Sequence, residues 1–197
     1  MSLTVARYNL AELVEMIDGP NKLKCRAILM DHGDLFKRTY GSTHNHQNWP
    51  GGYWDHIVEV MNRAVFEYRV NPRPFPFSLS DSLLVLFLHD LEKPWKYKIS
   101  PGGLLVHNYD FKTDKDQHDF VRDKISECGI ILTPEHENAL YYVHGEGDDY
   151  SNERRIMGPL AAFCHICDVW VARIDFDFPL ANNDPWSGAR RIRLDSK

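Results

Sequence analysis

The stretch SLSDSLLVLFLHDLEK, residues 78–93, carries the most information about the fold. Its middle is apolar on every side of a helix, which predicts a buried central helix rather than a surface one. Ser78 or Ser80 is suited to cap its start, because a serine hydroxyl accepts a hydrogen bond from a free amide of the first turn. His89 and Asp90 follow at its end. Polar groups beside so many apolar neighbours are costly unless they are paired or bind a metal.

The rest of the chain also has helical patterning, apart from one hairpin. Apolar residues recur at intervals near 3.6, for example at Ile57, Val60, Met61, Ala64 and Val65 on one face of a helix. Helices are expected at residues 9–18, 22–38, 53–70, 78–93, 114–128, 134–144 and 154–174. The alternating stretch 93–108 contains Pro-Gly-Gly and predicts a short β-hairpin. We therefore expect one all-α domain over residues 1–197, with a single short β-hairpin and a polar C-terminal tail.

Composition narrows the class of protein and its partners. The chain has 197 residues, 43% of them hydrophobic, and a formal net charge of −5. A long nucleic-acid duplex would be repelled overall, and no Lys/Arg run compensates for this. No apolar stretch approaches the ~20 residues that span a bilayer, and the first residues lack a signal-peptide pattern. Four cysteines do not suggest a disulfide framework. These features predict a cytoplasmic protein outside the membrane, and they leave open whether it forms a homo-oligomer.

Histidines and aspartates recur beside the expected helices. His56, His118 and His144 lie on or at the end of three of them, the pair His89-Asp90 ends the buried helix, and Asp168 lies inside the last helix. Imidazole and carboxylate groups together suit a divalent transition metal. Neighbouring residues of a helix point about 100° apart, so His89 and Asp90 would flank an ion or contact two ions.

Five motifs in the same order resemble those of the HD-domain superfamily of metal-dependent phosphohydrolases. Their order and rough spacing match across residues 44–173, which is most of the chain. They are HNHQNWPGGYWDHIVEV (44–60), LFLHDLEK (86–93), HDFVRDKISECGIIL (118–132), ALYYVHGE (139–146) and AAFCHICDVWVAR (161–173). A single His-Asp dipeptide is a weak signal, whereas five elements in order are a strong one. The resemblance implies an HD-domain-like helical bundle and a hydrolase.

The resemblance also assigns roles to residues. His56, His89, Asp90 and Asp168 match the core metal ligands, and His118 and His144 match the two extra histidines of members that hold a second ion. This implies two divalent ions, drawn from Mn, Fe, Co, Ni, Zn or Mg, with Asp90 bridging them. Lys93 matches the family's lysine and would neutralise a phosphate or hold Asp90. Glu92 departs from the family's usual glycine and could act as an acid or base toward the leaving group.

The chemistry that follows is attack on phosphorus by a water that divalent ions have activated. Asp90, Glu92 and Lys93 are thus the candidate catalytic residues. Loop aromatics such as Trp49 and Trp95 could stack on a nucleobase. Lys96 near Lys93 could bind phosphate, and His46 lies at the mouth of the expected site. We therefore expect a small phosphorylated substrate, namely a phosphate ester or phosphodiester of a nucleotide or short oligonucleotide.

Several alternatives remain open from the sequence. The same ligand set suits an HD-fold di-iron oxygenase, or a non-catalytic module that binds a metal or a nucleotide. His136 competes with His144 as a ligand, and His144 is preferred because PEHEN (134–138) has the pattern of an exposed first turn. His165 lies on the same helix face as Asp168, where a packing role is favoured over ligation. Each proposed ligand also has a structural alternative, such as a cap, a salt bridge or a backbone hydrogen bond.

Overall fold

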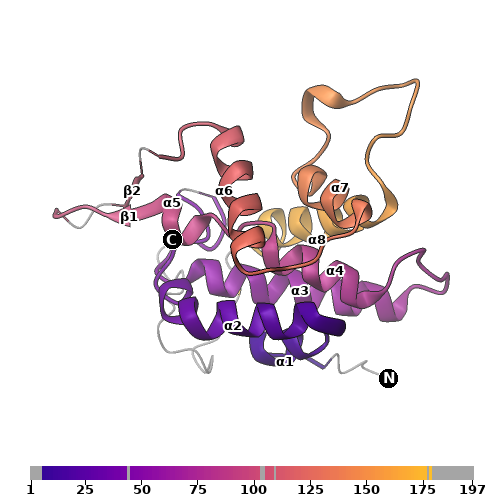
Figure 1. The fold of residues 1–197 in the computed structure, drawn as a ribbon, viewed down its shortest axis with the longest axis horizontal. Coiled ribbons are helices and arrows are strands. Elements are labelled where there is room, and N and C mark those ends of the chain that lie inside the picture. The colour runs from indigo at the N-terminus through magenta and orange to yellow at the C-terminus, as the bar shows by residue number, and fades with distance from the viewer. Residues whose placement is uncertain (1–5, 44, 103–104, 109, 177, 179–197) are drawn as a thin grey trace, which may run out of the picture.

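The computed structural model of the protein describes residues 6–43, 45–102, 105–108, 110–176 and 178, and this part is mostly helical (Figure 1). The elements are α1 (Leu10–Glu15), α2 (Gly19–Phe36), α3 (Gly52–Val70), α4 (Leu79–Leu88), α5 (Lys93–Lys96), β1 (Tyr97–Ile99), β2 (Leu105–His107), α6 (Asp114–Glu127), α7 (Pro134–Tyr142), a 3₁₀ turn (Gly147–Asp149) and α8 (Pro159–Arg173).

The central helix is α4, as its composition predicts. Every residue from Ser82 to Leu88 is buried, and α4 packs against α3, α7 and α8. Ser78 caps its start through a capping box with Asp81, so that of the two candidate serines Ser78 is the cap. Helices α1 and α2 lie on one side of this core, and α6 and α7 lie on the other (Figure 1). The apolar side chains of α3 and α4 hold these layers together.

The predicted hairpin is confirmed, and it projects from the helical body (Figure 1). Strands β1 and β2 pair in antiparallel fashion, with Tyr97 opposite His107. The expected helix at 78–93 is divided in two. Helix α4 ends at Leu88, a turn carries His89 and Asp90, and the short α5 begins at Lys93. The His-Asp pair is therefore held in a turn that follows the buried helix.

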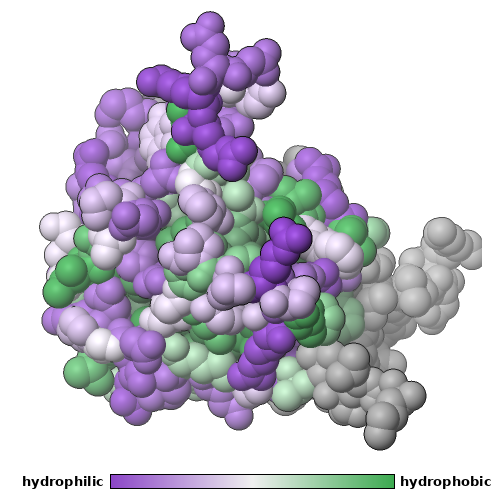
Figure 2. Space-filling view, turned by 90° about the vertical axis from the view of Figure 1, so that its right-hand side faces the viewer, coloured by the Kyte–Doolittle hydropathy of each residue, from purple (hydrophilic) through white to green (hydrophobic). Residues whose placement is uncertain are grey.

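The expected start of the last helix at residue 154 is wrong, because α8 begins at Pro159. Proline suits the first helical position, where its missing amide costs nothing. The amide of Gly158 donates instead to Asn138 Oδ1, at 2.8 Å. Residues 150–158 form the loop between the 3₁₀ turn and α8, and the segment between α7 and α8 makes the hydrophilic projection at the top of Figure 2.

Two parts of the sequence named above lie outside the described residues: the polar tail that follows residue 181, and His44. Among the helices that the structure describes, none is sufficiently long and apolar to traverse a bilayer.

Candidate metal centre

Four side chains from distant parts of the sequence meet inside the domain: His56, His89, Asp90 and Asp168. His56 Nε2 lies 3.2 Å from Asp168 Oδ1 and 3.4 Å from Asp90 Oδ2. His89 Nε2 lies 3.2 Å from Asp90 Oδ2 and 3.7 Å from Asp168 Oδ1. Ligand atoms of His56, His89 and Asp168 all lie within 4.8 Å of one another, so that these three buried residues could hold a metal ion. We refer to the four residues as the histidine–aspartate cluster.

Three packed core helices deliver this cluster. His56 lies near the start of α3, Asp168 lies within α8, and the His89-Asp90 pair follows the last residue of α4. Because α3, α4 and α8 pack against one another, polar side chains on their inner faces must share one buried space. All four residues are at most 8% exposed. A buried group of this polarity needs compensation.

Each imidazole of the cluster faces hydrogen-bond acceptors on both sides. His56 Nδ1 lies 3.3 Å from Gln47 Oε1, and His89 Nδ1 lies 2.8 Å from the carbonyl oxygen of Leu86. These oxygens can only accept, so Nδ1 carries the proton in both rings. Within the described chain, neither Nε2 atom has a hydrogen-bond partner, whereas Asp90 Oδ2 pairs with Lys93 Nζ. A cation beside the two carboxylates would satisfy both Nε2 atoms, so the donor set fits a divalent metal.

The pKa values of the cluster show how its charges are balanced. Burial lowers the pKa of His56. Burial also opposes protonation of His89, but the carboxylates of Asp90 and Asp168 outweigh it and raise the pKa of His89 to about 10. Burial disfavours ionisation of Asp90, yet Lys93 and His89 hold its pKa well below the usual range. In the metal-free protein, the proton on His89 and the ammonium of Lys93 thus balance two carboxylates. A divalent ion would displace the proton from His89 Nε2 and supply its charge instead, because a ligating imidazole nitrogen is unprotonated.

Lys93 and Glu92 complete the buried shell. Lys93 Nζ lies 2.5 Å from Asp90 Oδ2, which is one of the two roles expected for this lysine. Glu92 is 5% exposed, and burial together with the charge of Asp90 raises its pKa. A raised pKa favours the protonated form of this carboxyl group, which can donate a proton.

The two additional histidines occupy different places. His144 follows the end of α7 and approaches the cluster, with Nε2 3.6 Å from Asp90 Oδ1 and Nδ1 3.4 Å from Asp168 Oδ2. His118 lies on α6, where its ring packs edge-on against Tyr141 with 5.4 Å between the centroids. The structure thus brings His144 to the cluster, and no contact between His118 and the cluster is recorded among the described residues.

A cavity of about 590 Å³ connects these residues. His89, Glu92 and His144 line one part of it, and His118 lines another part. Its further lining residues come mainly from α6 and α7. The charged and polar ones are Lys115, Gln117, Asp119, Arg122 and Glu137, and the apolar and aromatic ones are Val121, Ile125, Leu132, Leu140 and Tyr141. A volume of this size is typical of small-molecule sites.

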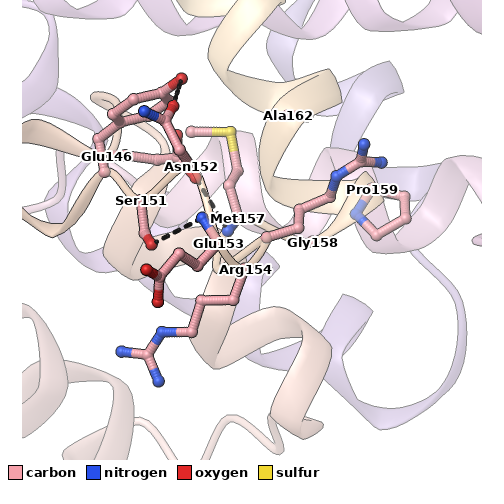
Figure 3. Close-up of a pocket in the computed structure, with 11 residues that line it drawn as sticks. Glu146, Ser151, Asn152, Glu153, Arg154, Met157, Gly158, Pro159 and Ala162 are labelled. Carbon is pink, nitrogen blue, oxygen red and sulfur yellow. Dashed lines mark hydrogen bonds between the residues drawn. The ribbon is translucent and has the colours of Figure 1, made fainter.

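A second cavity of about 560 Å³ lies between the loop before α8 and the first turn of that helix (Figure 3). Figure 3 shows Glu146, Ser151, Arg154 and Met157 around it. None of the predicted site residues lines this cavity. The predicted chemistry therefore belongs to the first cavity.

The predicted substrate residues are only partly placed at that cavity. Lys96 donates to Gln117 Oε1 at 2.9 Å, and Gln117 lines the cavity. Trp95 packs against His32 and Phe120. His46 stacks near His56, with 4.8 Å between ring centroids, and burial beside His56 and Lys93 lowers its pKa to about 3.

The expectation that Trp49 stacks on a base is wrong. Its side chain is 2% exposed, and its indole nitrogen donates to Asp55 Oδ2 at 2.7 Å. The ring therefore belongs to the core of the loop before α3, where it leaves no open face for a ligand. Pro50, Gly51 and Gly52 indicate a loop at this point, but the sequence does not indicate that Trp49 packs inward.

Two buried residues beside the cluster were given no role from the sequence. Gln47 contacts His56, as described above. Tyr53 is fully buried, its hydroxyl has no hydrogen-bond partner in the described chain, and the charges of Asp90 and Glu92 help burial to raise its pKa. The position of Tyr53 three residues before His56 on α3 was an available signal, since residues i and i+3 share a helix face.

Comparisons with known proteins add no family to these observations. No family model matches the chain, and neither the curated proteins nor the solved structures contain a significant match.

Proposed function

We propose that the protein is a metal-dependent phosphohydrolase of the HD-domain kind. Its substrate would be a phosphate ester or phosphodiester of a nucleotide or short oligonucleotide. The observation that carries this proposal is the pair of buried, unpartnered histidine Nε2 atoms that face the carboxylates of Asp90 and Asp168 beside a cavity of about 590 Å³. Metal-ligating atoms next to a small-molecule cavity are the arrangement that hydrolysis by activated water requires.

His56, His89, Asp90 and Asp168 would hold the first ion. Asp90 directs Oδ2 toward His56 and His89 and Oδ1 toward His144, an arrangement that supports a bridging role. His144 would be a ligand of a second ion, and His118 would have to reach it across the cavity that they share. Bound divalent ions would supply an activated water and charge neutralisation of the phosphate.

The remaining roles belong to the protein's own side chains. Glu92, with its raised pKa, would donate a proton to the leaving oxygen. Lys115 and Arg122 on α6 would attract the phosphate, in competition with Asp119, with which both now pair. The apolar wall that Val121 and Leu140 form would contact the organic part of the substrate.

The test is a phosphate-release screen with mononucleotides, cyclic dinucleotides and short oligonucleotides, each with Mn²⁺, Co²⁺, Ni²⁺, Fe²⁺ or Mg²⁺. We expect release in the wild type, loss of at least ~1000-fold in Asp90→Ala, and no change in Asp123→Ala, a matched control on the exposed side of α6. A folded wild type that releases no phosphate with any pair would overturn the proposal. Oxygen consumption by anaerobically purified, iron-loaded protein would point to the oxygenase instead.

A further inference from the structure

Gln47 lies in the loop before α3 and has no role in the scheme above. Its side chain is fully buried. The amide nitrogen, Nε2, donates to the carbonyl oxygens of Asp175 at 3.0 Å and Phe178 at 3.2 Å, in the segment after α8. Because those carbonyls can only accept, the nitrogen must face them. The oxygen, Oε1, is thereby directed at His56 Nδ1, 3.3 Å away.

The backbone gives Gln47 little freedom to turn away. Its own φ is 40°, in the left-handed region. Its amide donates to the carbonyl of Phe176 at 2.7 Å, and its carbonyl accepts from the amide of Gly41 at 3.1 Å. A Cβ atom at Gly52 would lie only 1.7 Å from the Gln47 carbonyl oxygen, so the helix can begin here only with glycine. The paired glycines before His56 thus permit the loop to press Gln47 against the start of α3.

We propose that Gln47 is a positioning residue that keeps the His56 proton on Nδ1 and so presents the Nε2 lone pair to the metal centre. The inference rests on the metal centre of the proposed function. An imidazole with the opposite tautomer would point an N–H at the ion and could not bind it. Loss of such an outer partner typically lowers metal affinity by ~10–100-fold. The segment that contains Asp175 and Phe178 thereby influences the metal centre, because it fixes which end of the Gln47 amide faces His56.

The experiment compares Gln47→Met, Gln47→Glu and the wild type, with Asn48→Met as the matched control at the exposed neighbouring position. Zn²⁺ serves as the probe, because it is diamagnetic. Its affinity is measured by calorimetry, and the ¹⁵N chemical shifts of His56 report which ring nitrogen carries the proton and which is coordinated.

We expect a proton on Nδ1 and coordination through Nε2 in the wild type. Gln47→Met should bind Zn²⁺ ~10–100-fold more weakly and lose the Nδ1 proton signal. Gln47→Glu keeps an acceptor facing His56, so it should stay within about threefold of the wild type, as should Asn48→Met. Equal weakening by the two Gln47 substitutions would overturn the proposal, because it would indicate a role only in holding the segment after α8.

Two further measurements keep the test decisive: one does not need the variants, and the other does not need the ion. If Gln47→Met does not fold, the wild-type spectrum still decides, since coordination of His56 through Nδ1 would overturn the proposal. If the wild type binds no Zn²⁺, the metal centre of the proposed function fails. The positioning role is then judged in the metal-free protein, where a hydrogen-bonded Nδ1 proton on His56 supports it and a proton on Nε2 alone refutes it.

Discussion

Two arrangements of histidine and aspartate in the described part of the chain differ in how their hydrogen bonds are completed. In the pair His136–Asp81, His136 Nδ1 accepts from the amide of Thr133 and Nε2 lies 3.1 Å from Asp81 Oδ1. The other oxygen of Asp81 accepts from the amide and hydroxyl of Ser78, both at 2.8 Å. In the histidine–aspartate cluster, by contrast, neither His Nε2 atom has a hydrogen-bond partner among the described residues.

The difference separates a structural site from a candidate binding site. Every polar atom of the pair His136–Asp81 has a partner within the protein, so nothing further is needed to offset burial. The cluster leaves buried polar atoms unmatched, which is costly unless a ligand completes them. Both arrangements contain buried histidines, so burial of the imidazole does not distinguish them, whereas the hydrogen-bond partners of its two nitrogens do.

The largest expected effect tests this contrast directly. His89→Ala should weaken Mn²⁺ binding by more than ~100-fold, beyond what loss of an outer partner produces. His136→Ala should leave Mn²⁺ affinity unchanged but lower the free energy of unfolding by about 1–2 kcal/mol, the typical cost of a lost helix cap. Calorimetric titration and urea unfolding of the metal-free proteins measure both quantities. The contrast fails if His136→Ala weakens Mn²⁺ binding as strongly as His89→Ala.

The next effect concerns the number of ions. We expect two Mn²⁺ per chain in the wild type and one in His118→Ala, because the first ion depends on the cluster and the second on the histidines of α6 and α7. His144→Ala should also lose the second ion and should weaken the first, since His144 contacts both carboxylates. Elemental analysis after dialysis gives the ratio. A wild type that holds a single ion would show that the second site does not exist.

Another buried carboxylate, Glu59, provides an intermediate case. It lies on α3 and pairs with Arg7, with Arg7 Nη1 3.0 Å from Oε2. Burial outweighs this pair and raises the pKa of Glu59 to about 7, from 4.5. The folded chain therefore holds a proton that the unfolded chain releases, so the free energy of unfolding should fall as pH rises from 4.5 to 7. The fall is on the order of 3 kcal/mol, since one pKa unit is ~1.4 kcal/mol.

Glu59→Gln should remove this pH dependence while leaving Mn²⁺ binding intact. Urea unfolding of the metal-free protein at several pH values between 4.5 and 7 makes the comparison. If the variant and the wild type show the same slope, Glu59 is ionised in the folded protein and Arg7 has outweighed its burial.

The smallest effect belongs to Asp81. Burial opposes its ionisation, but hydrogen bonds from Ser78 and His136 hold its pKa below the 3.8 that is ordinary for an aspartate. A lowered pKa contributes stability above that value and loses it as pH falls through the folded pKa. The stability difference between the wild type and Asp81→Asn should therefore shrink as pH is lowered below 3.8. Circular dichroism during urea unfolding would detect this, and a difference that does not vary with pH would contradict it.

The sequence was informative wherever one physical pattern dominated. Helix α4 could be predicted because an apolar run of its length has no stable place except the core, and the hairpin because Pro-Gly-Gly interrupts an alternating segment. The start of α8 at Pro159 was missed, because the loop before it contains charged residues that are compatible with a helix. At the end of that loop, the amide of Gly158 donates to Asn138, a contact that forms only in the folded chain.

The candidate site shows the same division. The residue types of the cluster were predictable, because histidines and aspartates beside apolar helices need compensation. The burial of Trp49 against Asp55 at the start of α3 and the contact of Gln47 with the segment after α8 were not, since both depend on how the loop before α3 folds onto the rest of the chain. Which of those contacts form is determined by tertiary packing, not by local pattern.

The bond between His136 and Asp81 joins the capping boxes of two helices, α7 and α4, at their starts. His144 and His89 lie just beyond the opposite ends of the same helices. The two helices are therefore fixed to each other at their N-termini, and the number of residues in each helix determines the position of the histidine that follows it. Adding one residue to α4 would advance His89 by ~1.5 Å and swing it by ~100°. Helix length, independently of side-chain chemistry, would then be under constraint in this protein.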